Sequence, residues 1–311
     1  IAEELNSPIG ALVGFQVRFN ERISESCCVK LMTDGILLSE IQSDAYLSKY
    51  EVIIVDEAHE RSLNIDFLLG FLKRLLSKRK ELKVIITSAT IDVDKFSSHF
   101  NDAGIIAVEG RTFPVETRYS DINLTNDERE LNAIEHIVES VASLVMKTAK
   151  DTEQNNDILV FLSSEREIRE TAKNLRKKKF TNSKILPLYS RLPQSEQNKI
   201  FQKHRSQRII LSTNVAETSI TVPGIKYVVD TGLARISRYS FQSKVQRLPI
   251  ERVSQASANQ RKGRCGRVEE GICVRLYSED DFNARPLYTD PEITRTNLAA
   301  VILRMLSLDL G

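Results

Sequence analysis

The 311-residue sequence contains no tryptophan and only four cysteines, Cys27, Cys28, Cys265 and Cys273. The spacing of the cysteines matches neither a zinc site nor a disulfide framework, which favours reduced thiols in a cytosolic protein. The sequence also lacks an apolar run long enough to cross a bilayer. These absences argue against a disulfide-rich secreted domain and a helical membrane protein, so we expect a cytoplasmic protein with no membrane partner.

The sequence also lacks an excess of charge of either sign. The chain has 44 Lys and Arg residues against 42 Asp and Glu residues, a formal net charge of +2, so no global field marks a nucleic-acid-binding protein. Basic residues do gather locally, at 73–83, 166–179 and 261–267. Such patches can contact phosphate groups, although the first two could equally be the solvated faces of helices.

What the sequence does have is a repeated alternation of apolar strand-like segments and amphipathic helix-like segments. This pattern is typical of α/β folds with parallel sheets, and a linker at Pro114 and 120–126 divides it into two runs, which predicts two α/β domains in tandem. A β-hairpin is expected near 236–253, with an irregular surface loop as the alternative. We further expect strands at 52–55, 84–87, 158–162, 184–189, 208–212, 227–230 and 272–276, and helices at 63–80, 94–100, 131–145, 165–179 and 194–204.

The most informative segment is EVIIVDEAHER, residues 51–61. Its continuous apolar run from Val52 to Val55 predicts a fully buried parallel strand. Asp56 and Glu57 follow at the carboxyl end of that strand, where open α/β sheets bind ligands. One carboxylate could hold Mg²⁺ and the other could activate water for phosphate cleavage. Taken alone, the pair could also simply open a loop or cap the next helix.

A second cluster of candidate residues lies in QASANQRKGRCGR, residues 255–267. On a helix, Arg261, Arg264 and Arg267 would lie near one face, where three guanidinium groups repel one another unless an anion is present. Arginine suits phosphate because its planar guanidinium offers a fork of donors, so the cluster is chemically complementary to the carboxylate pair. The plainer alternative is an exposed basic segment without a ligand.

The sequence also resembles a known family over essentially its whole length. Its motifs are similar, in content and order, to those of DEAH-box ATP-dependent RNA helicases of superfamily 2, of the bacterial HrpA type. They are TDG at 33–35, DEAH at 56–59, SAT at 88–90, LVFLSSEREI at 159–168, STNVAETSITVPGIKYVVDTG at 212–232 and QRKGRCGR at 260–267.

This resemblance implies an α/β fold with two tandem RecA-like parallel-sheet domains. Residues 1–118 would form the first helicase domain, truncated at its N-terminus, and residues 119–282 the second. The segment 236–253 would be the strand-separating hairpin of the second domain. Residues 283–311 would be the start of a winged-helix domain.

The resemblance also implies roles around ATP and Mg²⁺. Asp56 would hold Mg²⁺ through water, and Glu57 would share this metal site and act as the general base. His59 and Gln260 would bridge the domains near the γ-phosphate. The other residues implied at the nucleotide are Ser219, which would help to position water, Phe201, which would stack on the adenine, and Arg264 and Arg267, which would contact the phosphates, Arg267 as an arginine finger.

For nucleic acid, the resemblance implies an RNA path that contacts sugar and phosphate rather than bases, which suits a motor that moves along any sequence. The residues that would line this path are Arg18, Thr33, Gly35, Ser163, Thr213 and Thr218. Ser88 and Thr90 would couple ATP hydrolysis to unwinding. Taken singly, His59 is more often a structural histidine, and Thr33 and Ser163 could be ordinary caps.

One motif of the family is missing from these residues. No G-x-x-x-x-G-K-[ST] sequence, the P-loop that cradles nucleotide phosphates, precedes Thr33. The sequence therefore predicts a fragment that begins after the P-loop and does not by itself hydrolyse ATP at a useful rate. Pro223 stands where relatives often carry an Asp that contacts ribose, which favours loose nucleotide choice and the use of other NTPs.

Three functions remain open from the sequence. The first is a monomeric NTP-driven motor that unwinds RNA. The second is the same motor acting on DNA or mixed duplexes, since proteins that contact the backbone discriminate mainly through the 2′-hydroxyl. The third is a non-catalytic nucleic-acid-binding fragment, against which the presence of Glu57, Gln260 and Arg267 argues.

Overall fold

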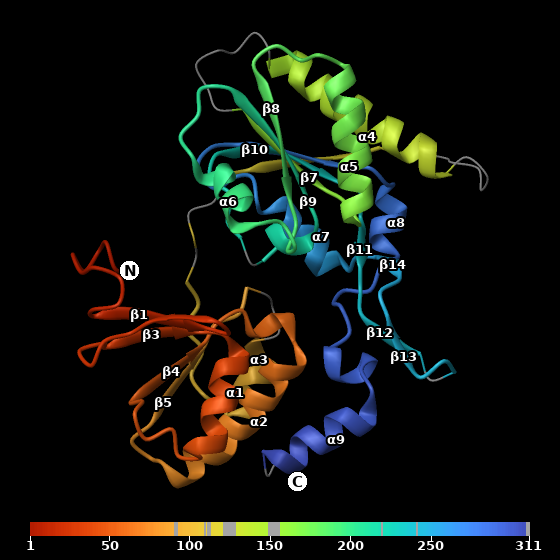
Figure 1. The fold of residues 1–311 in the computed structure, drawn as a ribbon. Coiled ribbons are helices and arrows are strands. Elements are labelled where there is room, and N and C mark those ends of the chain that lie inside the picture. Colours follow the sequence, from red (N-terminus) through yellow and green to blue (C-terminus); the bar gives the residue numbers. More distant parts are fainter. Residues whose placement is uncertain are drawn as a thin grey trace. The chain divides into compact units, whose positions relative to one another are not determined.

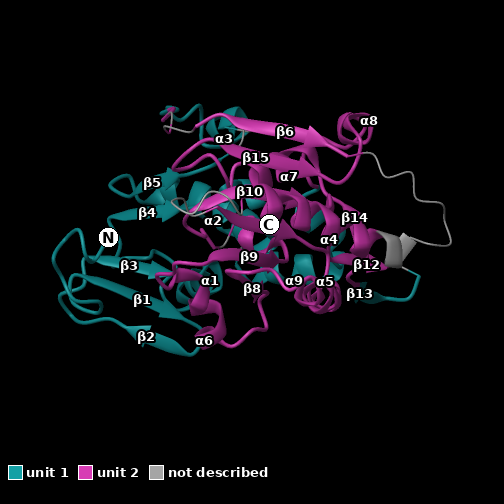
Figure 2. Ribbon diagram, turned by 90° about the horizontal axis from the view of Figure 1, so that it is seen from above, with its two compact units in different colours: residues 1–106, 241–246, 290–311 teal, residues 107–240, 247–289 magenta. Residues whose placement is uncertain are grey.

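The computed structural model describes residues 1–89, 93–108, 110, 113–120, 129–148, 156–218, 220–240 and 242–308. The chain divides into two compact units (Figure 2). Unit 1 comprises residues 1–106, 241–246 and 290–311, and unit 2 comprises residues 107–240 and 247–289. Unit 1 therefore includes residues 241–246 and 290–311, which are far from residue 106 in the sequence. The three domain ranges expected from the sequence stay a prediction.

Unit 1 contains two small sheets and the helices that pack on them (Figure 1). Strand β1 (Val13–Val17) pairs antiparallel with β2 (Asn20–Arg22) and parallel with β3 (Val29–Met32), and β4 (Val52–Val55) pairs parallel with β5 (Lys83–Ile86). The helices and short 3-10 turns are α1 (Asp34–Ser43), η1 (Ala58–Glu60), α2 (Leu63–Lys78), α3 (Val93–His99), η4 (Glu292–Arg295) and α9 (Leu298–Ser307).

Apolar residues at helical spacing build the core of unit 1 against one face of β4. Leu38 of α1 and Leu72 of α2 have no exposed surface, and they cluster with Ile53 and Val55 of β4. Val301 of α9 joins the same cluster. The predicted strand at 52–55 and the predicted helices at 63–80 and 94–100 are therefore confirmed as elements, with small shifts of their ends.

The expectation that the strand at 52–55 is fully buried is wrong, and its neighbour β5 is also partly exposed. Val52, Ile54 and Ile85 are 45%, 61% and 49% exposed. Successive side chains of a strand point to opposite faces, and among the described residues the core of unit 1 lies on only one face of the β4–β5 pair. A continuous apolar run indicates two apolar faces, but it does not show that both are covered within the chain at hand.

Unit 2 is built on a six-stranded sheet in which all the described pairings are parallel. This confirms the parallel α/β architecture predicted by the alternation of elements. The strand at 115–119 was not expected from the sequence. In spatial order the strands are β6 (Val115–Tyr119), β15 (Gly271–Arg275), β10 (Ile225–Asp230), β7 (Asp157–Phe161), β9 (Gln207–Ser212) and β8 (Ser183–Leu188).

Both faces of this sheet are covered, as is usual for parallel sheets. Ile158 and Val160 of β7 face a core shared with α4 (Arg129–Thr148) and α5 (Glu165–Lys177) (Figure 1). Leu159 and Phe161 face a second core, which contains Ile200. The other short elements of unit 2 are α6 (Gln194–Gln197), η2 (Asn198–Phe201), η3 (Asn214–Ala216), α7 (Gln255–Lys262) and α8 (Glu279–Asn283).

The segment 236–253 forms a β-hairpin rather than an irregular loop, as predicted. Strand β11 (Leu233–Arg235) pairs antiparallel with β14 (Ile250–Arg252), and β12 (Arg238–Ser240) pairs with β13 (Val245–Arg247). No helix within the described ranges is long and apolar enough to cross a membrane.

Candidate functional site

The segment after β4 is held in place by hydrogen bonds to the end of β5. The backbone N–H of Thr87 donates to Val55 O over 2.9 Å, and that of Ala58 donates to Thr87 O over 3.0 Å. These bonds continue the strand pairing beyond both strands, while Glu57 takes a left-handed backbone conformation with φ 53°. Asp56 and Glu57 therefore leave the sheet at the carboxyl end of β4, as the sequence predicts.

Asp56 is oriented by two donors. The Thr87 hydroxyl and the backbone N–H of Glu57, the latter over 3.0 Å, both donate to Asp56 Oδ1. Asp56 is exposed and the Glu57 side chain is 45% exposed, so both carboxylates can be reached from solvent. Two adjacent, accessible carboxylates fit Mg²⁺, which binds hard oxygen ligands and usually takes one or two carboxylates together with water and substrate phosphates.

His59 connects this segment to the residues after β5. Its Nδ1 accepts a hydrogen bond from the backbone N–H of Ala89 over 3.1 Å, and its Nε2 lies 3.2 Å from Glu57 Oε2. An Nδ1 that accepts is unprotonated, so Nε2 carries the proton and donates to the Glu57 carboxylate. His59 thus fixes the side chain of the candidate general base relative to the Ser88-Ala89 backbone.

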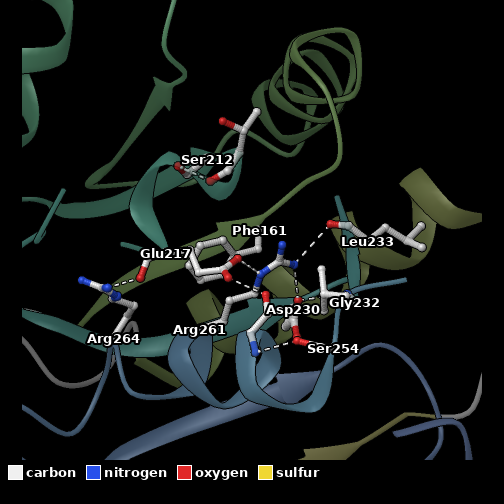
Figure 3. A network of polar contacts seen from close by, with 12 residues as sticks. Phe161, Ser212, Glu217, Asp230, Gly232, Leu233, Ser254, Arg261 and Arg264 are labelled. Atoms are coloured by element: carbon white, nitrogen blue, oxygen red, sulfur yellow. Dashed lines mark hydrogen bonds and ion pairs between the residues drawn. The ribbon is translucent and has the colours of Figure 1, made fainter. Parts of the chain in front are cut away.

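In unit 2, the expectation that three arginines share a helix face is wrong, because α7 ends at Lys262. Arg261 is fully buried between two carboxylates (Figure 3): Nε lies 2.8 Å from Glu217 Oε2 and Nη1 lies 2.8 Å from Asp230 Oδ1. Burial opposes the charged form of Arg261, but the two carboxylates outweigh it and raise the pKa of the guanidinium above its ordinary value. The anion that this arginine needs is supplied by the chain itself.

Arg264 and Arg267 lie beyond the helix and approach one hydroxyl. Arg264 Nη1 and Arg267 Nη1 lie 3.5 and 3.4 Å from Thr221 Oγ1, and Arg264 Nη2 donates to the backbone oxygen of Glu217 (Figure 3). Gly266, between them, has φ +74°, and a Cβ there would lie 2.4 Å from a methyl group of Val115. Only glycine can adopt this backbone conformation so close to Val115. The next residue, Arg267, is exposed.

Comparisons with known proteins show what this chain is similar to. Residues 135–269 match the family model described as the helicase conserved C-terminal domain. The chain is 62% identical over 311 residues to the ATP-dependent RNA helicase HrpA of Escherichia coli (strain K12), covering 100% of this chain and 24% of that protein. It is 41% identical over 321 residues to the ATP-dependent RNA helicase DHX33 of Mus musculus, covering 99% and 45%. The crystal structure of the Escherichia coli DEAH/RHA helicase HrpB matches with a TM-score of 0.87 at 32% identity, covering 98% of this chain and 38% of that one.

The chain is similar over its whole length to members of the DEAH-box helicase family. Its α/β architecture is the RecA-like fold of that family. The chain spans about a quarter of the length of HrpA from Escherichia coli, so the activity and substrates of the whole protein are matters for proposal.

The predicted contacts of unit 2 lie at opposite ends of the sheet. Ser163 lies two residues after the end of β7 and Thr213 directly follows β9, whereas Phe201 and Pro223 precede β9 and β10. Parallel strands require the chain to return between them, so the segment 213–224 runs from the predicted nucleic-acid end to the predicted nucleotide end. The rule that ligands bind at the carboxyl ends of strands therefore applies to Ser163 and Thr213 but not to Phe201 and Pro223.

The structure places the remaining predicted residues as follows. Ser163 is buried and its hydroxyl donates to Glu167 over 2.7 Å, while the cap of α5 is Ser164. Thr33 is exposed at the N-cap position of α1, where its side chain makes no capping bond. Arg18 is exposed. Gly35, Ser88, Thr213, Thr218 and Gln260 are partly exposed, and Thr90 and Ser219 lie outside the described residues.

Sequence reasoning missed the residues that hold the candidate side chains. Thr87 orients Asp56, Glu217 binds Arg261 with its carboxylate and Arg264 with its carbonyl, and Asp230 completes the buried pair. Thr87 directly precedes the SAT motif, and Glu217 and Asp230 lie inside the 212–232 motif. Their position in or beside a motif was the one sequence feature that could have pointed to them. Their partners could not be read from the sequence because each contact joins segments at least thirty residues apart.

Proposed function

We propose that the protein containing this chain is an NTP-dependent motor that hydrolyses ATP with Mg²⁺ and uses the energy to translocate on RNA and unwind it. The observation that carries this proposal is the contact chain from Glu57 through His59 to the Ala89 backbone. It joins a candidate general base to the segment expected to couple hydrolysis with unwinding. The relatives are named ATP-dependent RNA helicases, which supports the same function.

The proposed chemistry assigns a separate role to each candidate residue. Asp56 and Glu57 would hold Mg²⁺, whose positive charge would neutralise negative charge on the phosphates. Glu57 would accept the proton of the attacking water, with His59 fixing its carboxylate and Ser219 helping to position the water. Arg264 and Arg267 would stabilise the charge that develops on the transferred phosphoryl group. Gln260 would assist near the γ-phosphate, and Phe201 would stack on the base.

We further propose that nucleic acid is bound through its backbone by Arg18, Thr33, Gly35, Ser163, Thr213 and Thr218, with Ser88 and Thr90 in the coupling segment. RNA is the expected substrate, and DNA or mixed duplexes are the alternative. The motor is expected to act as a monomer in the cytoplasm. Because the 311 residues contain no P-loop sequence, we expect them not to turn over ATP at a useful rate by themselves.

The test uses the full-length protein with Glu57→Gln, which keeps the size of the side chain but removes the base. We expect kcat of RNA-stimulated ATP hydrolysis to fall by about 10²- to 10⁴-fold, the usual contribution of a general base, while ATP and RNA binding persist. Glu60→Gln, at an exposed glutamate of the same turn, is the matched control and should leave kcat unchanged.

The outcomes distinguish the three functions. Unwinding of RNA duplexes with 3′ overhangs, but not of matched DNA duplexes, supports an RNA motor. Equal or faster unwinding of DNA favours the alternative substrate. A full-length wild-type protein that binds RNA without any NTP hydrolysis would show a non-catalytic binding protein and would contradict the proposed function.

A further inference from the structure

Unit 2 contains a buried ion pair that the proposed chemistry does not use. Asp157 begins β7 and has no exposed surface, and Arg208, near the start of β9, is also buried. The two strands are parallel neighbours. Arg208 Nε and Nη2 donate to Asp157 Oδ2 over 2.8 and 2.6 Å, and the Arg208 backbone N–H donates to Asp157 Oδ1 over 2.6 Å. Asp157 therefore balances the charge of Arg208 and fixes the plane of its guanidinium.

The guanidinium of Arg208 also binds two backbone carbonyls from different segments. Nη1 donates to the oxygen of Ile200 in η2, and Nη2 donates over 2.7 Å to the oxygen of Pro223, in the loop before β10. The donors of an arginine form a rigid fork, so the two carbonyls are held at a fixed separation. Arg208 is thus a buried bridge between η2 and the loop 221–224.

Each bridged carbonyl adjoins the surface on which the nucleotide is expected. Ile200 is fully buried and anchors η2, whereas the next residue, Phe201, is 51% exposed. Pro223 lies two residues after Thr221, whose hydroxyl both candidate phosphate-binding arginines approach. The bridge therefore sets the position of an exposed aromatic ring relative to the loop that carries the phosphate-side contacts.

His204 packs against the same ion pair. Its Nε2 lies 3.4 Å from Asp157 Oδ2, and its Nδ1 lies 2.7 Å from Ser206 O. The imidazole thereby covers the carboxylate from the segment between η2 and β9. Shielding from water strengthens hydrogen bonds and ion pairs, so the bridge between the two segments is rigid.

We propose that Arg208 is a positioning residue that determines how tightly the base and sugar of the nucleotide are bound. It holds Phe201 at a set separation from the loop 221–224 and touches neither the nucleotide nor the nucleic acid. The phosphates and the RNA are bound by other residues. This inference rests on the proposed NTP hydrolysis.

The test uses Arg208→Lys in the full-length protein, because lysine keeps a positive charge beside Asp157 but cannot reach both carbonyls at once. We expect the KM for ATP and the inhibition constant of ADP to rise about tenfold, as expected for lost hydrogen bonds to a charged group. The inhibition constant of pyrophosphate, which has no base or sugar, the kcat and the Kd for single-stranded RNA should change by less than about twofold. Arg205→Lys, at an exposed arginine before the same strand, is the matched control and should change none of these values.

A double-mutant cycle with Phe201→Ala separates positioning from a general structural role. If Arg208 acts through Phe201, Arg208→Lys should raise the KM for ATP much less in the Phe201→Ala protein than in the wild type. Additive effects, an equal loss of ADP and pyrophosphate binding, or a fall in kcat as large as the rise in KM would overturn the inference.

Two further comparisons keep the test decisive. If Arg208→Lys unfolds below the assay temperature, Asp157→Glu displaces the guanidinium while keeping the ion pair, and it should show the same selective loss of ADP. An Asp157→Glu protein with unchanged ADP binding would then overturn the inference. A wild-type protein without RNA-stimulated hydrolysis contradicts the proposed function itself, whereas an active wild type and an unchanged Arg208→Lys contradict only the role of Arg208.

Discussion

The backbone N–H of Ala89 donates a hydrogen bond to His59 Nδ1 over 3.1 Å. This contact indicates the tautomer of the imidazole. Because Nδ1 accepts, the proton lies on Nε2, which is 3.2 Å from the Glu57 carboxylate. A histidine that could have been merely structural therefore joins two motifs that lie thirty residues apart.

Replacing His59 should impair the hydrolysis step according to which contact is lost. His59→Asn can still accept from Ala89, His59→Gln can still donate to Glu57, and His59→Ala can do neither. We expect kcat for RNA-stimulated ATP hydrolysis to fall most for the alanine variant, by roughly 10- to 100-fold, because the general base loses its orientation. Steady-state kinetics of the full-length proteins measure this, and an alanine variant as active as the other two would contradict it.

Removing the Thr87 hydroxyl should weaken the metal site. Thr87→Val deletes the donor that orients Asp56 Oδ1, whereas Thr87→Ser keeps it. We expect the Mg²⁺ concentration for half-maximal ATP hydrolysis to rise about tenfold for the valine variant, as for a lost hydrogen bond to a charged group. A Mg²⁺ titration of both variants and the wild type is the measurement. The prediction fails if serine and valine variants have the same requirement.

Removing Arg261 should destabilise unit 2. Arg261→Met leaves Glu217 and Asp230 largely buried without their cation, which should lower the free energy of unfolding by about 3–5 kcal/mol. Hydrogen exchange of the peptide covering β10 in mild denaturant reports this local stability. The control is Arg252→Met, because the Arg252 side chain is 70% exposed in its pair with Asp281, and the expected effect is below about 1 kcal/mol. Equal effects would contradict the prediction.

The stability of unit 2 should fall at alkaline pH because of its buried thiols. Burial raises the pKa of Cys265 from 9.0 to about 12, and burial also raises the pKa of Cys273. The unfolded chain ionises these thiols above about pH 9 while the folded unit keeps them neutral, so their contribution is complete below pH 9 and is lost as the pH rises towards 12.

Unfolding midpoints at about pH 8 and about pH 10.5 test this linkage. The double variant Cys265→Ala, Cys273→Ala should lose less stability between the two pH values than the wild type. Cys28→Ala removes an exposed thiol and should leave the pH dependence unchanged. A double variant with the same pH dependence as the wild type would show that these thiols do not contribute.

Local sequence patterns predicted much of the fold and part of the candidate site. The apolar run of β7 forms a strand that is buried on both faces, since α4 and α5 cover one face and Ile200 lies in the core on the other. The same kind of run in β4 led to the wrong expectation, since Ile54 is exposed. The difference lies in what packs against each strand, and that depends on residues far away in the chain.

The sequence by itself determined the order of elements, the parallel α/β architecture and the identity of the motif residues, because hydrophobic periodicity and short motifs are local properties. Only the tertiary structure decided that Arg261 is bound by Glu217 and Asp230, that Arg264 and Arg267 approach Thr221, and that Arg208 bridges η2 and the loop 221–224. These contacts follow from the packing of segments around one sheet. Their partners are distant in the sequence, and no local pattern records them.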